Sequence, residues 1–337
     1  MEENTEQRVD LTLFSEKIQE LKDRIASVIV GQEQTVDLVL TAILANGHVL
    51  IEGVPGVAKT LLARLTARLI DADFSRVQFT PDLMPSDVLG TTVFNMKTNG
   101  FDFHQGPIFA DIVLVDEINR APAKTQAALF EVMEERQISI DGTTHRMGDL
   151  YTILATQNPV EQEGTYKLPE AQLDRFLMKI TMDYPSLEEE VNILERHHTN
   201  AALVKLDDIT PAITKEELLS LRAFMNQVFV DRTLLQYIAL IVQQTRTSKA
   251  VYLGASPRAS VAMLQSSKAY ALLQGRDFVT PEDIKFVAPY VLQHRLILTA
   301  EAEMEGYSPV KVTQRLIDKV EAVSYTHLRA HETCADL

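Results

Sequence analysis

The chain has 337 residues, of which 46% are hydrophobic, and this length and content can support two subdomains. It has no run of about 18 apolar residues and begins with a polar, acidic segment, so we expect no membrane span and no signal peptide, and a cytoplasmic location. The formal net charge of −15 disfavours a surface that follows nucleic-acid phosphates, and a single cysteine excludes an internal disulfide.

After a polar N-terminus (residues 1–10) that we expect to be flexible, residues 11–185 alternate between helical and strand-like segments. Two helices with an apolar face are predicted first, over Ser15–Val28 and Glu33–Asn46. The alternating segments that follow are Val49–Ile51, Leu61–Leu69, Val77–Phe79, Ile112–Val115, Lys124–Glu134, Thr152–Ala155 and Leu177–Thr181. This order predicts an α/β fold in which a parallel sheet is flanked by helices.

A glycine-rich segment, GVPGVAKT at residues 53–60, joins the first predicted strand to a helix. It matches G-x-x-x-x-G-K-[ST] except at Ala58, where we expect a negative φ that alanine tolerates. Converging backbone N–H groups, a helix N-terminus and a lysine favour a nucleoside triphosphate; the alternative is a strand-turn-helix with a chance Lys-Thr pair. The predicted binding residues are Gly53, Val54, Pro55, Gly56, Val57, Ala58, Lys59, Thr60 and Leu61.

Two segments within this region are predicted to form hairpins. Leu89 to Gly106 has a tight Asn99-Gly100 turn between aromatic-rich strands, and Gln137 to His145 turns at Asp141-Gly142. Ordinary surface hairpins are the alternative to a functional role for these insertions.

An acidic pair, Asp116-Glu117, follows the apolar run that ends at Val115. The carboxyl ends of parallel strands are where open α/β sheets bind ligands. Asp116 is therefore predicted to hold Mg²⁺ together with the hydroxyl of Thr60, and Glu117 to polarise the attacking water. Without the glycine-rich segment at residues 53–60, which we call the phosphate loop, the same pair would indicate only a solvated strand end.

Further polar residues follow the next two strands. Asn158 comes after the strand that ends near Ala155 and can orient water or the γ-phosphate, although Asn-Pro is also a common turn opener. Arg175 lies at the end of a short helix directly before the strand Leu177–Thr181. Because a lone arginine is usually a surface cation, neither residue identifies a site by itself.

From residue 186 to residue 322 the pattern is helical and predicts an all-α lid. The predicted helices are Leu187–His197, Glu216–Phe229, Leu234–Thr245, Arg258–Leu273 and Pro281–His294, with a loop over Thr199–Ile213. Ser256 and Pro257 fit the N-cap and first position of one helix, which puts Arg258 in its first turn. A cation there opposes the helix dipole, so we expect Arg258 to face an anion.

The final segment, residues 323–337, does not fit this pattern. Its sequence VSYTHLRAHET resembles the translation of a transposon adapter used in sequencing libraries, so we expect a non-native tail. Metal binding by His327, His331 and Cys334 is the alternative.

The motifs GVPGVAKT, LVDEINRAP, LATQNPVEQEGTYKLPEAQLDRF and GASPRA together resemble the MoxR family of AAA+ ATPases, from about Leu11 to about Glu321. The resemblance implies ATP and Mg²⁺ as cofactors and a ring oligomer, most often a hexamer. It assigns Walker A to Lys59 and Thr60, Walker B to Asp116 and Glu117, sensor 1 to Asn158, the arginine finger to Arg175, sensor 2 to Arg258, and the adenine pocket to Gly31 and Gln32. The two hairpins match insertions that line the ring's pore in the branch that also holds magnesium chelatase and the MCM helicases.

The resemblance favours ATP-driven remodelling or maturation of a protein client, often one that contains a von Willebrand factor A domain. A magnesium chelatase-like motor, an MCM-like nucleic-acid motor and a slowly cycling nucleotide-gated binding module are the alternatives. Nucleic acid is disfavoured because the second hairpin offers only His145 and Arg146 as contacts, although a local basic channel is compatible with an acidic chain.

Overall fold

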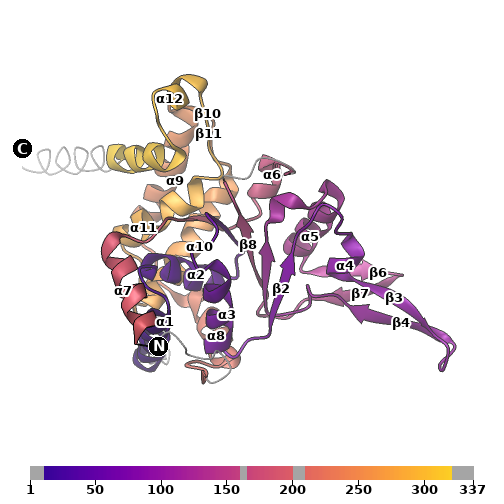
Figure 1. Cartoon of the computed structure of the whole chain (residues 1–337). Coiled ribbons are helices and arrows are strands. Elements are labelled where there is room, and N and C mark those ends of the chain that lie inside the picture. The colour runs from indigo at the N-terminus through magenta and orange to yellow at the C-terminus, as the bar shows by residue number, and fades with distance from the viewer. Residues whose placement is uncertain (1–10, 160–164, 200–208, 321–337) are drawn as a thin grey trace, which may run out of the picture.

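The computed structural model describes residues 11–159, 165–199 and 209–320 of the protein (Figure 1). The predicted flexible N-terminus (1–10), the predicted tail (323–337) and residues 200–208 of the predicted loop lie outside these ranges. Within them, no helix combines the length and the apolar character that crossing a membrane requires.

A five-stranded sheet with the strand order β2-β5-β8-β1-β9 forms the centre of the protein. Its strands are β1 (Val49–Gly53), β2 (Phe74–Gln78), β5 (Ile112–Asp116), β8 (Thr152–Gln157) and β9 (Met178–Met182). Each neighbouring pair is parallel, so all five strands end at the same edge of the sheet. The predicted parallel sheet is confirmed, although the strand predicted at Val77–Phe79 begins earlier, at Phe74.

Successive side chains of each strand point to opposite faces of the sheet, and both faces are buried. In β5, Ile112 and Leu114 belong to one apolar cluster, whereas Val113 and Val115 belong to a second cluster on the other face. The first cluster includes side chains of α1 (Leu11–Val28), α2 (Glu33–Leu44) and α3 (Lys59–Leu69), and the second includes those of α4 (Pro85–Leu89) and α5 (Ala123–Glu135). This double burial explains why the inner strands β1, β5 and β8 are mainly apolar, whereas the outer strand β2 (FSRVQ) is not.

The chain after β9 is mainly helical. Its elements are α7 (Leu187–His198), α8 (Lys215–Phe224), α9 (Arg232–Thr247), β10 (Val251–Leu253), α10 (Pro257–Leu273), α11 (Pro281–Leu292), β11 (Ile297–Leu298) and α12 (Ala300–Met304), and residues 309–320 are also helical. The lid predicted as all-helical therefore also contains an antiparallel pair, β10–β11, whose strands are too short to show a period of two in the sequence. The division between core and lid at residues 185 and 186 remains a prediction.

The lid packs directly against the sheet domain. Helix α10 contacts α2 as well as its lid neighbours α9 and α11, and α11 contacts β9. Buried side chains of α8, α9, α10 and α11 belong to the same apolar cluster as those of α1, α2 and α3. The orientation of the lid is therefore fixed by a continuous core rather than by a linker.

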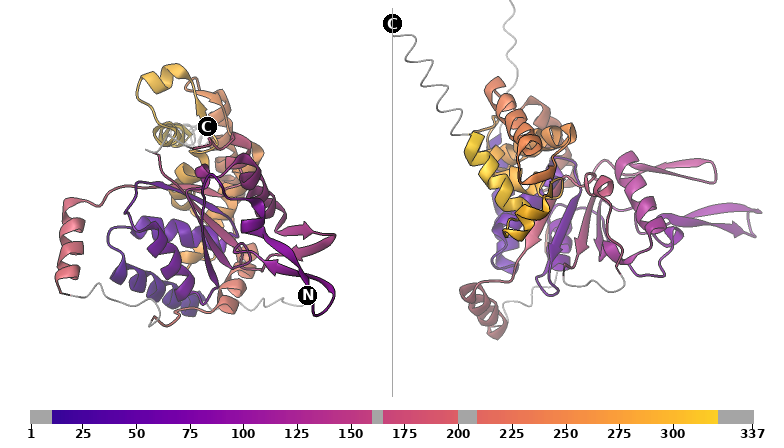
Figure 2. Two further views of the ribbon diagram at one scale, coloured as in Figure 1. Left: turned by 45° about the vertical axis from the view of Figure 1, so that its right-hand side comes forward. Right: turned by 90° about the horizontal axis from the view of Figure 1, so that it is seen from above.

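Two hairpins project from the sheet on the side away from the lid (Figures 1 and 2). They pair β3 (Gly90–Asn95) with β4 (Gly100–Gln105) and β6 (Gln137–Ile140) with β7 (Thr143–Arg146). The second turns at Asp141 and Gly142 as predicted, and both residues have positive φ. The prediction of a tight Asn99-Gly100 turn is wrong, because Gly100 pairs with Asn95 inside the ladder and the loop consists of residues 96–99.

His48, the residue before β1, links three elements in the interior. The side chain is only 4% exposed; its Nε2 lies 3.2 Å from the Met133 carbonyl oxygen, and its Nδ1 accepts the Ile153 N–H at 3.0 Å. Burial, and secondarily the charge of Arg136, lower the pKa of His48 from 6.5 to about 3. The ring is therefore neutral when folded, with its proton on Nε2.

We expect His48 to make the fold acid-sensitive. Between pH 6.5 and about 3 the unfolded chain binds a proton at this residue that the folded chain does not, so stability falls as the pH drops through this window. The loss attributable to His48 reaches about 2 kcal/mol at pH 5. Urea unfolding of wild type and His48→Gln should therefore show a stability difference that shrinks by about this amount between pH 7 and pH 5.

His104→Gln, at an exposed histidine of the first hairpin, is the control for the loss of a titratable group. A difference between wild type and His48→Gln that stays constant with pH would contradict the proposed neutral state.

Candidate functional site

The glycine-rich segment lies at the carboxyl end of β1, where the chain turns into α3. The Lys59 ammonium donates to the carbonyl oxygens of Gly53 at 2.5 Å and Val54 at 3.2 Å. Burial lowers the pKa of Lys59, while the charges of Asp116 and Glu117 act in the opposite direction. The loop therefore folds around its own lysine, and that lysine is close to the acidic pair.

Ala58 departs from the sequence-based expectation. Its φ is +62°, in the left-handed region, so the prediction of a negative φ is wrong. The chain reverses from β1 into α3 at this point, and a left-handed residue before Lys59 makes the reversal, as glycine does at lower cost in other proteins. A Cβ built on Gly56, also at positive φ, would meet no atom within 4 Å, so the loop is open on that side. Strained backbone around an open loop is typical of ligand sites.

The acidic pair is held by a polar network at the end of β5. Asp116 is 6% exposed; its Oδ1 accepts the Thr156 hydroxyl at 3.1 Å and its Oδ2 accepts Arg76 Nε at 2.6 Å. The Glu117 N–H donates to the same Thr156 hydroxyl at 3.0 Å. Thr156 therefore joins the two carboxylate residues to β8.

The Glu117 carboxylate is oriented from two sides. Its Oε2 accepts Gln78 Nε2 at 2.8 Å and lies 2.9 Å from Arg120 Nε. Glu117 itself has φ +56°, a left-handed conformation that ends β5 abruptly. The sequence reasoning missed Arg76, Gln78, Arg120 and Thr156; the only signal for them was polar side chains at or near strand ends that meet this edge.

Asn158 follows β8, which lies between β1 and β5 in the sheet, and is 7% exposed. The β8 register, Ala155 opposite Val115 and Thr156 opposite Ile51, carries this strand end between the acidic pair and the phosphate loop. The structure thus brings Gly53 to Thr60, Asp116, Glu117 and Asn158 to one edge of the sheet.

The phosphate loop and the acidic pair offer suitable groups for a magnesium-bound triphosphate. Thr60, in the first turn of α3, and Asp116 supply oxygen donors of the kind that Mg²⁺ prefers, and the loop amides together with Lys59 supply donors for phosphate oxygens. Gly56 is exposed, so the loop is open to solvent on that side.

The turn Ile29 to Gln32 lies between α1 and α2. Gln32 lines a cavity of about 220 Å³ together with Ile25, Ile29 and Val36. Gly31 has a φ of +72°, in the left-handed region that favours glycine. No residue of the phosphate loop lines this cavity, so the adenine-binding role of Gly31 and Gln32 remains a prediction.

The two predicted arginines lie at the other edge of the sheet. Arg175 precedes β9, and its Nη1 donates to the Phe130 carbonyl oxygen at 2.9 Å and lies 3.4 Å from Glu134 Oε2. Arg258 Nη2, at the start of α10, lies 3.4 Å from Glu134 Oε1. Glu134 of α5, which the sequence reasoning did not identify, is thus the anion that Arg258 faces in this chain.

The length of the strands separates these arginines from the phosphate loop. Both line a cleft of about 560 Å³ that also includes His48, the residue before β1, whereas the phosphate loop follows the end of β1. Five strand residues span roughly 16 Å. Arg175 and Arg258 therefore face a different surface from Lys59 of the same chain.

Comparisons with known proteins agree with these features. Residues 48–178 match the ATPase family associated with various cellular activities (AAA), and residues 243–318 match the AAA lid domain. The chain is 47% identical to the uncharacterised protein YeaC of Bacillus subtilis, over 88% of this chain and 92% of that protein. It is 44% identical to Chaperone MoxR1 of Mycobacterium tuberculosis, over 88% of this chain and 80% of that protein.

Two further relatives extend the agreement. Protein MoxR of Methylorubrum extorquens is 30% identical over 87% of this chain and 91% of its own length. A crystal structure of a candidate ATPase from Cytophaga hutchinsonii superposes with a TM-score of 0.84 at 40% identity, and the match covers 92% of this chain and 96% of that one. With the phosphate loop, the acidic pair and the helical lid in place, these similarities show that the chain belongs to the MoxR family of AAA+ ATPases.

Proposed function

We propose that the protein is a ring-forming ATPase that couples Mg²⁺-dependent ATP hydrolysis to the remodelling or maturation of a protein client. One observation carries the proposal: Lys59, Asp116, Glu117 and Asn158 lie at one edge of the sheet, whereas Arg175 and Arg258 lie at the other. One chain therefore presents two incomplete parts of a hydrolytic site on different surfaces.

Head-to-tail assembly completes the site. The surface that carries Arg175 and Arg258, here called the arginine surface, would face the phosphate loop of the next subunit. The two arginines would then supply positive charge to the phosphates that the neighbour's Lys59 binds. A heterologous contact of this kind repeats around a closed ring. Six subunits are expected from the resemblance to AAA+ proteins.

Within one subunit, the residues divide the chemistry. Thr60 and Asp116 would hold the metal, which supplies charge neutralisation at the phosphates, and Lys59 would bind the phosphate oxygens. Glu117 would accept a proton from the attacking water, with Gln78 and Arg120 fixing its carboxylate and Asn158 orienting the water.

The hairpins give the best indication of the client class. Near the tip of the first hairpin, Met96 is 89% exposed, Phe101 73% and Phe94 47%. At the base of this hairpin, the centroid of the Phe103 ring lies 4.3 Å from the centroid of the His145 ring of the second hairpin, so the two hairpins pack against each other. Exposed apolar tips favour contact with protein over nucleic acid. A pore position for these hairpins and a client with a von Willebrand factor A domain follow from the family resemblance.

The first test separates nucleotide binding from turnover. Lys59→Ala removes the cation that contacts phosphates and should abolish binding of a fluorescent ATP analogue. Glu117→Gln should bind it normally and lose turnover by about 100-fold or more in a phosphate-release assay, because the proton acceptor is gone. Hydrolysis by Glu117→Gln at the wild-type rate would contradict the role of Glu117 as proton acceptor.

A second test concerns Arg76, whose guanidinium occupies Asp116 Oδ2. Because Arg76 competes with a metal ion for this oxygen, Arg76→Met should lower the Mg²⁺ concentration needed for half-maximal hydrolysis. The Arg76 side chain is 51% exposed, so the expected decrease is at most about fivefold. Arg64→Met, at an exposed arginine of α3, should leave the Mg²⁺ titration unchanged. An unchanged or increased Mg²⁺ requirement for Arg76→Met would show that the two cations do not compete.

The third test addresses action between subunits. Arg175→Ala should bind ATP and hydrolyse it about 1,000-fold more slowly, which is the low end for loss of an arginine finger. Lys59→Ala subunits cannot hydrolyse ATP but still present Arg175, so mixing the two inactive variants should restore part of the activity. Light scattering with a slowly hydrolysed ATP analogue should show a ring. No activity in the mixture, together with a monomer at every nucleotide concentration, would overturn the proposal.

A further inference from the structure

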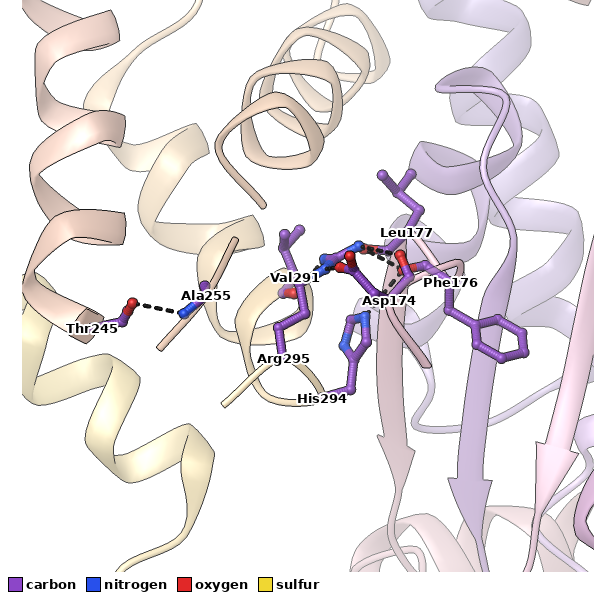
Figure 3. A network of polar contacts seen from close by, with 8 residues as sticks. All are labelled: Asp174, Phe176, Leu177, Thr245, Ala255, Val291, His294 and Arg295. Atoms are coloured by element: carbon purple, nitrogen blue, oxygen red, sulfur yellow. Dashed lines mark hydrogen bonds and ion pairs between the residues drawn. The ribbon is translucent and has the colours of Figure 1, made fainter. Parts of the chain in front are cut away.

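The segment that carries Arg175 is fastened to the lid by residues that follow α11 (Figure 3). Gln293 Nε2 donates to the Lys179 carbonyl oxygen at the start of β9, and His294 Nε2 lies 3.0 Å from the Phe176 carbonyl oxygen. Burial and the neighbouring Arg295 charge hold the pKa of His294 well below its usual value, so the ring is neutral and donates from Nε2. Both contacts reach the chain just after Arg175.

Arg295 makes the largest contribution to this junction. Its side chain is 5% exposed, and its Nε donates to Asp174 Oδ1 at 2.6 Å. The two terminal nitrogens donate to four carbonyl oxygens, those of Asp174 (3.3 Å), Phe176 (2.7 Å), Leu177 (3.2 Å) and Val291. All five N–H groups of the guanidinium therefore have acceptors.

Three of these acceptors are backbone oxygens on either side of Arg175. Residues 174–177 lie between α6 (Glu170–Leu173) and β9, so Asp174 and Phe176 are outside the sheet ladder. A buried carbonyl group without a partner costs about 1–3 kcal/mol, so Arg295 stabilises one backbone path for this segment. A lysine has three donors on one nitrogen and cannot reproduce this planar fork.

The start of α10, which carries Arg258, is held by the neighbouring lid helix. The Ala255 N–H donates to the Thr245 hydroxyl at 3.0 Å, and Arg246 Nε donates to the Ala255 carbonyl oxygen at 2.9 Å. Ser256, Arg295 and Asp174 line the same cavity of about 250 Å³. The arginine of the sheet domain and the arginine of the lid are thus fixed on either side of one junction.

We infer that Arg295 is a positioning residue for hydrolysis between subunits: it ties the segment carrying Arg175 to the lid that carries Arg258, so that both arginines reach the neighbouring nucleotide as one rigid unit. This inference rests on the proposed function, because Arg295 acts only through Arg175. It also means that any lid movement displaces Arg175 by way of Asp174, Phe176 and Leu177.

Arg222 provides a control, because it is a partly buried arginine that also donates to backbone oxygens. Its terminal nitrogens donate to the carbonyl oxygens of Asp149 and Ile43 at 2.6 Å each, and neither lies in the segment that carries Arg175. Loss of Arg222 should lower the melting temperature without a specific effect on hydrolysis.

The test measures melting temperature, the Kd of a fluorescent ATP analogue and kcat of ATP hydrolysis for Arg295→Met, Arg295→Lys, Asp174→Asn and Arg222→Met at a temperature where each is folded. Arg295→Met should keep Kd within about threefold and lose kcat by about 100-fold, because a misplacement near 1 Å costs about that much. Arg295→Lys should remain slow, and Asp174→Asn should show a smaller loss in the same direction. Arg222→Met should keep the wild-type kcat.

A double-mutant cycle then decides whether Arg295 acts through Arg175. Arg295→Met in an Arg175→Ala background should lower kcat by less than about twofold further, since the group that it positions is already absent. Wild-type kcat for Arg295→Met, or effects that multiply in the double variant, would overturn the inference. If Arg295→Met does not fold, Arg295→Lys and Asp174→Asn decide by the same cycle. Wild-type kcat for Arg175→Ala would instead overturn the proposed function itself.

Discussion

The direction of the parallel sheet is the constraint on which the rest of the site depends. Parallel strands bring all their carboxyl ends to one edge. The phosphate loop after β1, the acidic pair after β5 and Asn158 after β8 therefore meet there because of the strand direction alone. The same geometry forces residues before the strands, such as Arg175, to the other edge. One sheet thus creates both the binding site and its separation from the arginines, which is why the proposed activity needs a second subunit.

Pairing of opposite charges explains how the polar groups of this site are accommodated at the end of the sheet. The Asp116 carboxylate is buried, and Arg76 and Thr156 satisfy its two oxygens. Lys59 folds onto the loop carbonyls, and Glu117 is held by Gln78 and Arg120. In the proposed function, a magnesium-bound triphosphate would replace the carbonyl partners of Lys59 and the Arg76 contact with Asp116, whereas Gln78 and Arg120 would stay on Glu117. Ligand binding in the proposed function is therefore an exchange of partners, and its cost is set by contacts such as Arg76 to Asp116.

The sequence predicted the local features of this site well and the contacts between distant residues poorly. The phosphate loop, the acidic pair and the alternation of strands and helices are contiguous patterns, and each is present in the structure. The prediction of a negative φ for Ala58 is wrong, because the reversal of the chain between β1 and α3 overrides the preference of alanine for negative φ. The predicted Asn99-Gly100 turn is wrong because strand register, rather than local turn chemistry, places Gly100 in the ladder.

Thr156, Glu134 and Arg295 could not have been identified in the same way. Thr156 lies 40 residues from Asp116, Glu134 lies 41 and 124 residues from its two arginines, and Arg295 lies 121 residues from Asp174. No local period marks such pairs. Arg295 in particular reads as an ordinary charged residue after a helix. The role of Arg295 becomes visible only when the lid is docked against β9. Its guanidinium then donates to the carbonyl oxygens of Asp174 and Phe176, which lie outside the sheet ladder.

Glu134 shows how the arginine surface can be ordered and still available. Its one carboxylate serves both Arg175 and Arg258, each at 3.4 Å, and its side chain is 38% exposed. Long, solvated ion pairs of this kind contribute at most about 1 kcal/mol each. A neighbouring triphosphate has several negative charges and accepts short, charge-assisted hydrogen bonds from guanidinium groups, which makes it the stronger partner. The backbone positions of the arginines are therefore fixed by Arg295 and α10, while their ion pairs with Glu134 are weak; Arg175 also donates to the Phe130 carbonyl oxygen at 2.9 Å. Weak ion pairs suit the proposed exchange of Glu134 for the phosphates of a neighbouring subunit.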